Sequence, residues 1–287
     1  MKKSITLIFL VLLYNLQVIS AEEKDSLLIV FWNLENFFDY MDQGGGESDK
    51  DFSSYGSRHW TKKRFQTKCD AVAKSMFYIC SRYGRMPDVI GLAEIENRKV
   101  LSRLISQTLL RKHGYGIVHF ESSDRRGIDV AILYRKEVLS LESASAITPE
   151  YDGKPLTTRD ILYSQLSLTS GESIDVIVNH HPSKYGGSDE SDNRRIAVMK
   201  NLRALCDSLD PGGIIAMGDF NDTPDAAQFD LIDDILVNKA VAMHERGEGT
   251  IRYEGRWELI DMFLTDRMTD CCSVMEICRI PFLMVWD

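Results

Sequence analysis

Short apolar runs recur along the chain, and most of them have the length of a buried β-strand. The predicted strands are residues 27–31, 89–93, 116–121, 128–134, 138–147, 160–168, 173–179, 214–217 and 259–264. A further strand-like pattern covers roughly residues 274–285. Strands therefore dominate the pattern, and the predicted helices separate only some of them.

Three stretches repeat apolar residues every three or four positions, which is typical of amphipathic helices. One begins at Thr61, and the others cover residues 97–111 and 192–209. Residues 42–58 are rich in Gly, Ser and Asp and predict a mobile loop. Hairpin-like strand pairs alternate with crossover helices, and no change of composition divides the chain. The pattern predicts one α/β domain in which mixed sheets pack face to face with helices outside.

The composition narrows the class of protein. With 44% hydrophobic and 27% charged residues, the chain of 287 residues resembles a soluble globular protein, not a disordered or multi-span membrane protein. Its 43 acidic and 34 basic residues give a net charge of -9. This charge argues against a general nucleic-acid coat, because affinity for phosphate backbones comes largely from Lys and Arg. It leaves open an enzyme that handles phosphates through a metal ion.

The N-terminus has the pattern of a secretory signal peptide. Lys2 and Lys3 precede an apolar run at residues 5–14, and the small residues Ser20 and Ala21 follow. The run is shorter than the roughly 20 residues that span a bilayer, although an uncleaved anchor is the alternative. We expect a signal peptide at residues 1–21, a secreted or periplasmic protein of bacterial type, and no transmembrane span after cleavage.

Polar side chains gather where the predicted strands begin or end. These residues are Asn33, Glu35, Glu94, Asp129, His180, His181, Asp219 and Asn221, and Asp261 lies within the run WELIDMFL. Taken singly, a carboxylate after a strand is more often a turn or helix cap than a functional group. Their repetition predicts instead one site at the edge of a sheet.

The chemistry of these residue types is consistent with phosphate-ester hydrolysis. Oxygen ligands without cysteine suit a hard cation such as Mg²⁺, Mn²⁺ or Ca²⁺. A metal ion on Glu94 would neutralise one phosphate oxygen, while His180 donates a proton-bearing nitrogen to another. Asp219 can accept a proton from the attacking water, and Asn221 can hold the developing charge. Together these groups predict in-line attack of water on a phosphate ester.

Six motifs occur in an order that resembles a known superfamily. They are WNLEN, GLAEIEN, RGIDVAILY, VNHHPSKYGG, GDFND and WELID, between residues 27 and 264. The set is similar to the DNase-I-like endonuclease/exonuclease/phosphatase superfamily, and most of all to its secreted bacterial members. The resemblance implies a four-layer α/β/β/α sandwich of two mixed sheets that cleaves phosphoric esters with a divalent metal ion.

The resemblance also implies roles for individual residues. It places the metal ion at Glu94, with Asn33 and Glu35 beside it. It gives catalysis to His180, Asp219, Asn221 and Asp261, where Asp261 orients a second catalytic histidine. Arg126 is a candidate phosphate contact, and Asp129 of the same motif is a weaker one.

One motif of the superfamily is missing from the chain. The superfamily closes its site with a Ser-Asp-His motif on a late strand, whereas the last histidine here, His244, precedes Asp261. We expect that the domain at residues 22–287 lacks a C-terminal segment of roughly 30–60 residues. A natural short variant is the alternative. Without the second histidine Asp261 has no imidazole to orient, and loss of such an acid-base costs about 10²–10⁴-fold in rate.

Three functions stay open on the sequence. A secreted nuclease acting on DNA or RNA is favoured by a basic and aromatic cluster formed by Arg58, His59, Trp60, Lys62, Lys63 and Arg64. The same cluster is equally compatible with a solvated helix start. A phosphomonoesterase or phospholipid phosphodiesterase is favoured slightly by the acidic balance. A non-catalytic phosphate-ligand binding protein would follow from the missing histidine. We expect a phosphate-ester substrate and no stable protein partner in each case.

Overall fold

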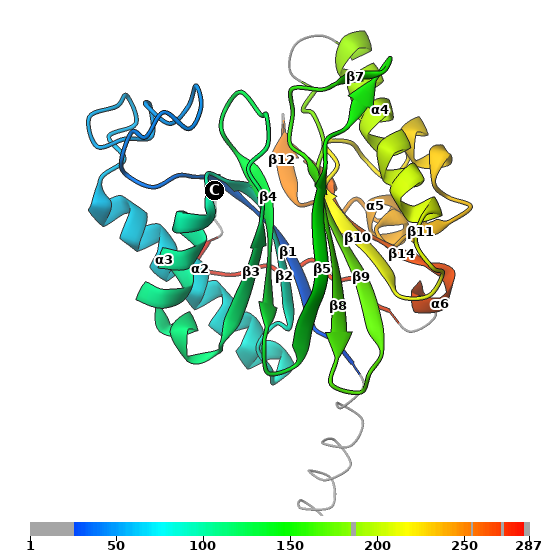
Figure 1. Ribbon diagram of the computed structural model, residues 1–287, viewed down its shortest axis with the longest axis horizontal. Coiled ribbons are helices and arrows are strands. Elements are labelled where there is room, and N and C mark those ends of the chain that lie inside the picture. Colours follow the sequence, from blue (N-terminus) through cyan, green and yellow to red (C-terminus); the bar gives the residue numbers. More distant parts are fainter. Residues whose placement is uncertain (1–25, 185–187, 254, 271–272, 284–287) are drawn as a thin grey trace, which may run out of the picture.

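The computed structural model describes residues 26–184, 188–253, 255–270 and 273–283 (Figure 1). The predicted signal peptide, residues 1–21, lies outside these residues. None of the helices that the structure describes has both the length and the apolarity needed to cross a membrane.

Four strands form the first sheet, in the order β1-β2-β4-β3. They are β1 (Ile29–Phe37), β2 (Val89–Ile95), β3 (Tyr115–His119) and β4 (Asp129–Arg135). The β1–β2 pair is parallel and the other two pairs are antiparallel, so the sheet is mixed. Helices α2 (Lys62–Tyr83) and α3 (Arg98–Gln107) and the short 3-10 helix η2 (Leu109–Lys112) follow the strands of this half.

Six strands form the second sheet, in the order β11-β14-β10-β9-β8-β5. They are β5 (Leu139–Ile147), β8 (Ile161–Leu168), β9 (Ser173–His180), β10 (Ile214–Asp219), β11 (Leu236–Asn238) and β14 (Asp261–Asp266). Only β9 and β10 run parallel among these pairs. The helices of this half are α4 (Ser188–Asp207), η3 (Ala227–Leu231), α5 (Val241–Glu245) and α6 (Arg267–Asp270). Two small hairpins complete the described elements, β6 (Glu150–Tyr151) with β7 (Lys154–Pro155) and β12 (Ile251–Tyr253) with β13 (Arg256–Glu258).

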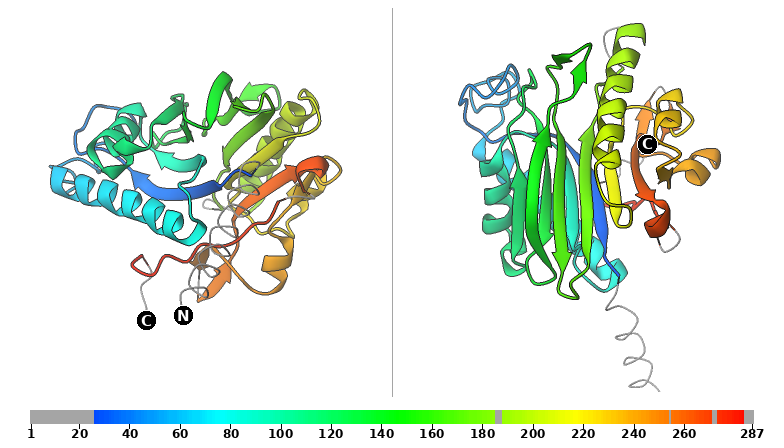
Figure 2. Two further views of the ribbon diagram at one scale, coloured as in Figure 1. Left: turned by 90° about the horizontal axis from the view of Figure 1, so that it is seen from below. Right: turned by 45° about the vertical axis from the view of Figure 1, so that its right-hand side comes forward.

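Three separate apolar cores hold these elements in four layers. One lies between the first sheet and helices α2 and α3, another between the second sheet and α4, and the third between the two sheets. In the middle core the sheets approach closely at Gly91, where an added Cβ would lie 2.8 Å from the sulfur of Met217. The views in Figure 2 show the two sheets packed face to face with helices outside. The predicted four-layer α/β/β/α sandwich is confirmed.

Most of the predicted elements are present, and Thr61 caps α2 as expected by accepting a hydrogen bond from the Arg64 backbone. The strand predicted at residues 274–285 is wrong in the part that the structure describes, because residues 273–283 pair with no other strand. Figure 2 shows this segment running across the molecule toward α2. It is held there by side chains, since Glu276 accepts hydrogen bonds from Arg82 and Tyr83. An apolar pattern alone does not separate a strand from such an extended segment packed on a core.

Candidate functional site

Asp219 lies at the end of β10, where the two sheets meet, and three predicted residues surround its carboxylate. The side-chain amide of Asn33, from β1 of the other sheet, donates to Asp219 Oδ2 over 3.0 Å. The backbone N–H of Asn221 donates to Oδ1 over 2.9 Å. His180 Nε2 lies 3.8 Å from Oδ2. The structure thus joins residues that are far apart in the sequence around one buried carboxylate.

Glu94 lies on a bulge of β2, where the strand register shifts between Ala93 and Ile95. A bulge aims a side chain out of the regular alternation of a strand. The Glu94 carboxylate turns toward the end of β1, and its Oε2 accepts from the Asn36 backbone over 2.6 Å. The Arg126 guanidinium lies 3.2 Å from the same oxygen.

Backbone strain is concentrated around this site. Glu35, Asn36, Glu94 and Asn221 have φ angles between 50° and 59°. In the described chain only two other non-glycine residues, His59 and Asp152, have positive φ. Such left-handed conformations cost free energy at residues with a Cβ, and they cluster at functional sites. Three of these four residues, Glu35, Glu94 and Asn221, are residues that the strand-end pattern predicts.

Asp219 and Asp261 lie opposite each other on the antiparallel strands β10 and β14. Burial raises the pKa of both carboxyl groups, and the nearby charge of Glu94 raises that of Asp219 further. The charges of Asp219 and Glu35 likewise raise the pKa of Asp261. Asp261 Oδ1 is buried and has no hydrogen-bond partner among the residues that the structure describes. The site therefore holds two carboxyl groups whose ionised forms are disfavoured by burial.

His180 and His181 are both buried at the end of β9. Burial lowers the pKa of His180 well below its usual value, and the positive charges of Arg159 and Arg126 lower it further. The imidazole of His180 is therefore neutral at neutral pH. Burial also lowers the pKa of His181, to about 3, and its ring packs against Phe220.

The sequence reasoning missed Arg159, which organises this part of the site. Its Nε donates to the His180 carbonyl over 3.1 Å, and its Nη1 pairs with Asp124 over 3.1 Å. Arg159 is only 8% exposed. The available signal was a basic residue immediately before the apolar run at 160–168, a place where a charged side chain is common without any function.

Lys68 of α2 is a second residue that the sequence reasoning missed. Its ammonium group donates to the Glu35 carbonyl over 2.8 Å. Burial lowers the pKa of Lys68 from 10.5 to about 8, although the charges of Glu35 and Glu94 oppose this shift. The apolar repeat that predicts this helix gave no reason to expect a lysine facing the strand end.

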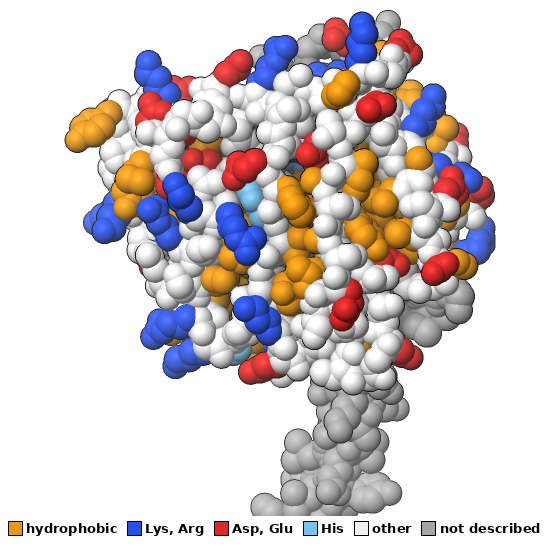
Figure 3. All heavy atoms as spheres, viewed as in Figure 1, with side chains coloured by type: hydrophobic (Ala, Val, Ile, Leu, Met, Phe, Trp, Pro, Cys, Tyr) orange, Lys and Arg blue, Asp and Glu red, His pale blue; other side chains and the backbone are white. Residues whose placement is uncertain are grey.

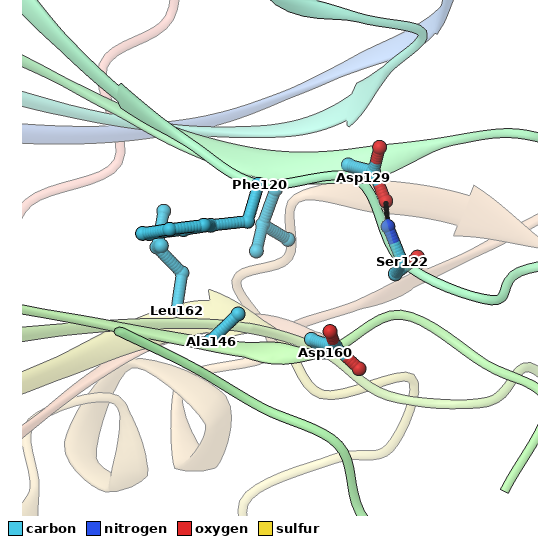
Figure 4. A pocket seen from close by; sticks show the side chains of 7 residues that line it. Phe120, Ser122, Asp129, Ala146, Asp160 and Leu162 are labelled. Atoms are coloured by element: carbon cyan, nitrogen blue, oxygen red, sulfur yellow. Dashed lines mark hydrogen bonds between the residues drawn. The ribbon is translucent and has the colours of Figure 1, made fainter. Parts of the chain in front are cut away.

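Arg126 lies beside Glu94, whereas Asp129 lies at the start of β4. Arg126 donates to the side-chain oxygen of Asn36 over 2.7 Å and so lies beside Glu94. Asp129 is buried at the start of β4 and accepts from the backbone of Ser122, as Figure 4 shows. The role of each as a phosphate contact stays a prediction.

Comparison with known families and structures identifies relatives of the chain. The protein-family model described as "Endonuclease/Exonuclease/phosphatase family" matches residues 28–269 of the chain. No curated protein matches. An endonuclease/exonuclease/phosphatase family protein from Bacteroides thetaiotaomicron is 13% identical with a TM-score of 0.56, covering 84% of this chain and 83% of that one. The mannosyl-6-phosphatase of the same organism is 13% identical with a TM-score of 0.55, covering 84% and 86%. TDP2 from D. rerio, complexed with single strand DNA product, is 17% identical with a TM-score of 0.52, covering 85% of each chain.

Proposed function

The chain belongs to the endonuclease/exonuclease/phosphatase family, whose members are phosphoesterases or nucleases, and from this premise we propose that it is a metal-dependent phosphodiesterase. The observation that carries the proposal is the hydrogen bond of Asn33 to Asp219, which brings the ends of both sheets together next to Glu94. A carboxylate that binds a cation, a carboxylate that handles water and a neutral imidazole then share one site.

The residues present fit a hard divalent cation. Glu94, Glu35 and Asn33 offer carboxylate and amide oxygens, which are the ligands that Mg²⁺ and Mn²⁺ prefer. Burial raises the pKa of Asp219 and of Asp261, and a bound cation would favour their ionised forms. We assign the ion to Glu94, supported by Asn33 and Glu35. When bound, such an ion polarises a phosphate oxygen and neutralises charge that develops on it.

The residues around Asp219 suit the activation of water. Asn33 and the Asn221 backbone both donate to the carboxylate and fix its plane. The raised pKa of Asp219 makes it a better proton acceptor than an exposed aspartate. In this proposal Asp219 takes a proton from water as the water attacks phosphorus. One N–H of the Asn221 side-chain amide donates to the His181 carbonyl over 2.8 Å. The other N–H is available to the charge that develops on the phosphate.

His180 and Arg126 suit the binding of the phosphate group. Because His180 is neutral, one of its nitrogens carries a proton to donate and the other is an acceptor. Its Nδ1 is buried without a hydrogen-bond partner in the described structure. Arg126 brings a guanidinium next to Glu94, where it is placed to neutralise a second phosphate oxygen.

We propose a nucleic acid as the substrate, on the basis of the basic residues around the start of α2. Arg58, Lys62 and Lys63 are exposed there. Figure 3 shows Lys and Arg side chains gathered on the side of the molecule where α2 and α3 lie. Trp60 contributes less than its residue type indicates, because its ring is covered by Arg64 at 5.4 Å and its Nε1 donates to the Phe38 carbonyl.

Three substrates with and without Mg²⁺ test this function. Purified protein is incubated with plasmid DNA, bis-p-nitrophenyl phosphate and p-nitrophenyl phosphate, each with Mg²⁺ or EDTA. We expect DNA cleavage that EDTA and Glu94→Gln both abolish. Activity on the monoester alone would show that the protein is a phosphatase and not a nuclease. Binding of all three substrates without turnover would identify a non-catalytic binding protein.

We also propose that the protein is exported, on the basis of the basic and apolar pattern at residues 1–21. N-terminal sequencing of the protein recovered outside the cytoplasm should begin near residue 22. Recovery of the intact N-terminus with the cells would contradict export by this route.

A further inference from the structure

A second group of ligand-type side chains lies at the ends of the β3–β4 loop (residues 120–128), where Asp129 is the strand partner of Ile95, the residue after Glu94. His119 is the last residue of β3, Asp129 is the first residue of β4, and Glu121 lies in the loop between them. One ligand atom from each of the three lies within 4.8 Å of the other two. The family motif that includes Asp129 gave no indication of this partnership with His119.

The contact between His119 and Asp129 does not have the geometry of an ordinary hydrogen bond. His119 Nε2 lies 3.4 Å from Asp129 Oδ2, whereas N–H···O bonds in proteins are about 2.7–3.2 Å long. The His119 side chain is 2% exposed, and Nε2 has no hydrogen-bond partner in the described part of the chain. Two ligands of one tetrahedral ion with bonds of about 2.1 Å are separated by about 3.4 Å. The separation therefore matches that of two ligands of a shared metal ion.

The charges at this position also favour a bound cation. Glu121 and Asp129 place two carboxylates near each other, and like charges at such distances are not both ionised without a proton or a positive ion between them. The Asp129 side chain is 5% exposed, whereas that of Glu121 is 67% exposed. Two ligands are thus fixed in the protein, and the third lies at the surface, where an ion can enter.

We propose that His119, Glu121 and Asp129 bind a divalent transition metal ion, of which Zn²⁺ is the best match. One imidazole and two carboxylates form a mixed nitrogen and oxygen site, which suits Zn²⁺ better than Mg²⁺ or Ca²⁺. This site is distinct from the one at Glu94, whose donors are carboxylate and amide oxygens.

The ion would fix the loop that carries Arg126. Asp129 already ties the loop to β4, since its Oδ1 accepts from the Ser122 backbone over 2.9 Å (Figure 4). A metal ion held by His119 and Glu121 as well would join both ends of the loop. From the middle of the loop Arg126 reaches Asn36 and Glu94. The ion is therefore structural, and its effect on turnover is exerted through the position of Arg126.

Metal content and thermal unfolding test the proposal without relying on activity. The purified protein is dialysed against low micromolar Zn²⁺, the bound metal is measured by mass spectrometry, and the unfolding midpoint is compared with that of EDTA-treated protein. We expect one Zn²⁺ equivalent that persists in Glu94→Gln, is lost in His119→Gln and Asp129→Asn, and raises the unfolding midpoint only where it binds.

Two variants guard against misfolding and against adventitious binding. Glu121→Gln changes an exposed side chain and should weaken Zn²⁺ at least tenfold while the far-ultraviolet circular dichroism stays unchanged. Glu172→Gln changes an exposed carboxylate of the β8–β9 turn and should leave Zn²⁺ binding unchanged. Equal Zn²⁺ binding by wild type, Glu121→Gln and His119→Gln, or no binding by the wild type, overturns the proposal.

Discussion

The side-chain amide of Asn33 donates a 3.0 Å hydrogen bond to the carboxylate of Asp219, and this contact joins the two sheets at the site. Asn33 also accepts from the Glu35 backbone over 2.9 Å, so its side chain is held at both ends. The amide orientation is thereby defined, with the NH₂ group toward Asp219. A donor fixed in this way orients the carboxylate on which the proposed proton transfer depends.

Replacement of Asn33 should slow catalysis without unfolding the protein. Asn33→Ala removes the donor to Asp219, and loss of such an orienting partner lowers activity by about 10–100-fold. The kcat for bis-p-nitrophenyl phosphate measures this effect. Asn193→Ala, on an exposed position of α4, is the matched control and should keep full activity. A normal kcat in Asn33→Ala would mean that Asp219 needs no orientation from the first sheet.

Arg126 and its neighbour Arg125 should differ sharply in their contribution to kcat/KM. Arg126 contacts Glu94 and Asn36, whereas Arg125 is exposed. Removal of a cation that stabilises the phosphoryl transition state costs about 10²–10³-fold, so we expect such a loss of kcat/KM in Arg126→Ala. Arg125→Ala lies on the same loop and should behave as wild type. Equal effects of the two variants would instead indicate that the loop contributes only a general positive charge.

The site was predictable from the sequence to the extent that it depends on where strands end. Asn33, Glu94, His180 and Asp219 all follow apolar runs, and parallel strands bring such positions to the same edge. The residues that were missed reach the site by other routes. Arg159 precedes its strand, and Lys68 comes from the face of α2.

The local conformation of the site was not predictable in the same way. Glu35, Asn36 and Glu94 have left-handed backbones. A positive φ is expected first of glycine, so the residue types at these positions did not predict it. Tertiary contacts impose them, as the 2.6 Å bond of the Asn36 N–H to Glu94 illustrates. The strand predicted at 274–285 failed for a related reason, because strand pairing depends on a partner edge that the local pattern does not encode.

The exposed basic residues before and at the start of α2 should contribute to DNA binding but not to the hydrolysis of a small diester. Replacement of Arg58, Lys62 and Lys63 by alanine removes three positive charges. If each contacts a phosphate, the slope of log affinity against log salt falls by about 3. Binding of a DNA duplex in EDTA, measured by fluorescence anisotropy at several salt concentrations, tests this slope. The kcat/KM for bis-p-nitrophenyl phosphate should change little.

A triple variant elsewhere on the surface is the control for lost charge. Lys136, Lys154 and Lys200 are exposed and lie outside the start of α2. Their replacement by alanine changes the net charge by the same amount. If both triple variants weaken DNA binding equally, only the net charge matters and the proposed binding surface is wrong.

Asp261→Asn should stabilise the metal-free protein at alkaline pH. Burial and the charge of Asp219 raise the pKa of Asp261, so its ionised form is disfavoured in the folded state. That penalty is fully present at pH 8.5, and asparagine removes it with a gain on the order of 1 kcal/mol. Urea unfolding in EDTA at pH 8.5 measures the difference. The exposed Asp230→Asn should give no gain, and destabilisation by Asp261→Asn would show that its charge is compensated.

Glu96 should make the metal-free protein less stable as the pH rises. Burial raises its pKa from 4.5 to about 8, with further contributions from the charges of Asp39 and Asp49. Between these pH values the folded protein holds a proton that the unfolded chain releases, so the free energy of unfolding falls with rising pH and stays low above pH 8.

Glu96→Gln keeps an acceptor for the Asp39 N–H and cannot ionise, so it tests this pH dependence directly. Urea unfolding in EDTA at pH 5 and pH 8.5 should give a smaller loss of stability for the variant than for wild type. The difference should exceed about 1.4 kcal/mol, the equivalent of one pKa unit. The exposed Glu172→Gln should follow the wild type. An equal loss in Glu96→Gln would mean that another group carries the dependence and that Glu96 is ionised in the folded protein.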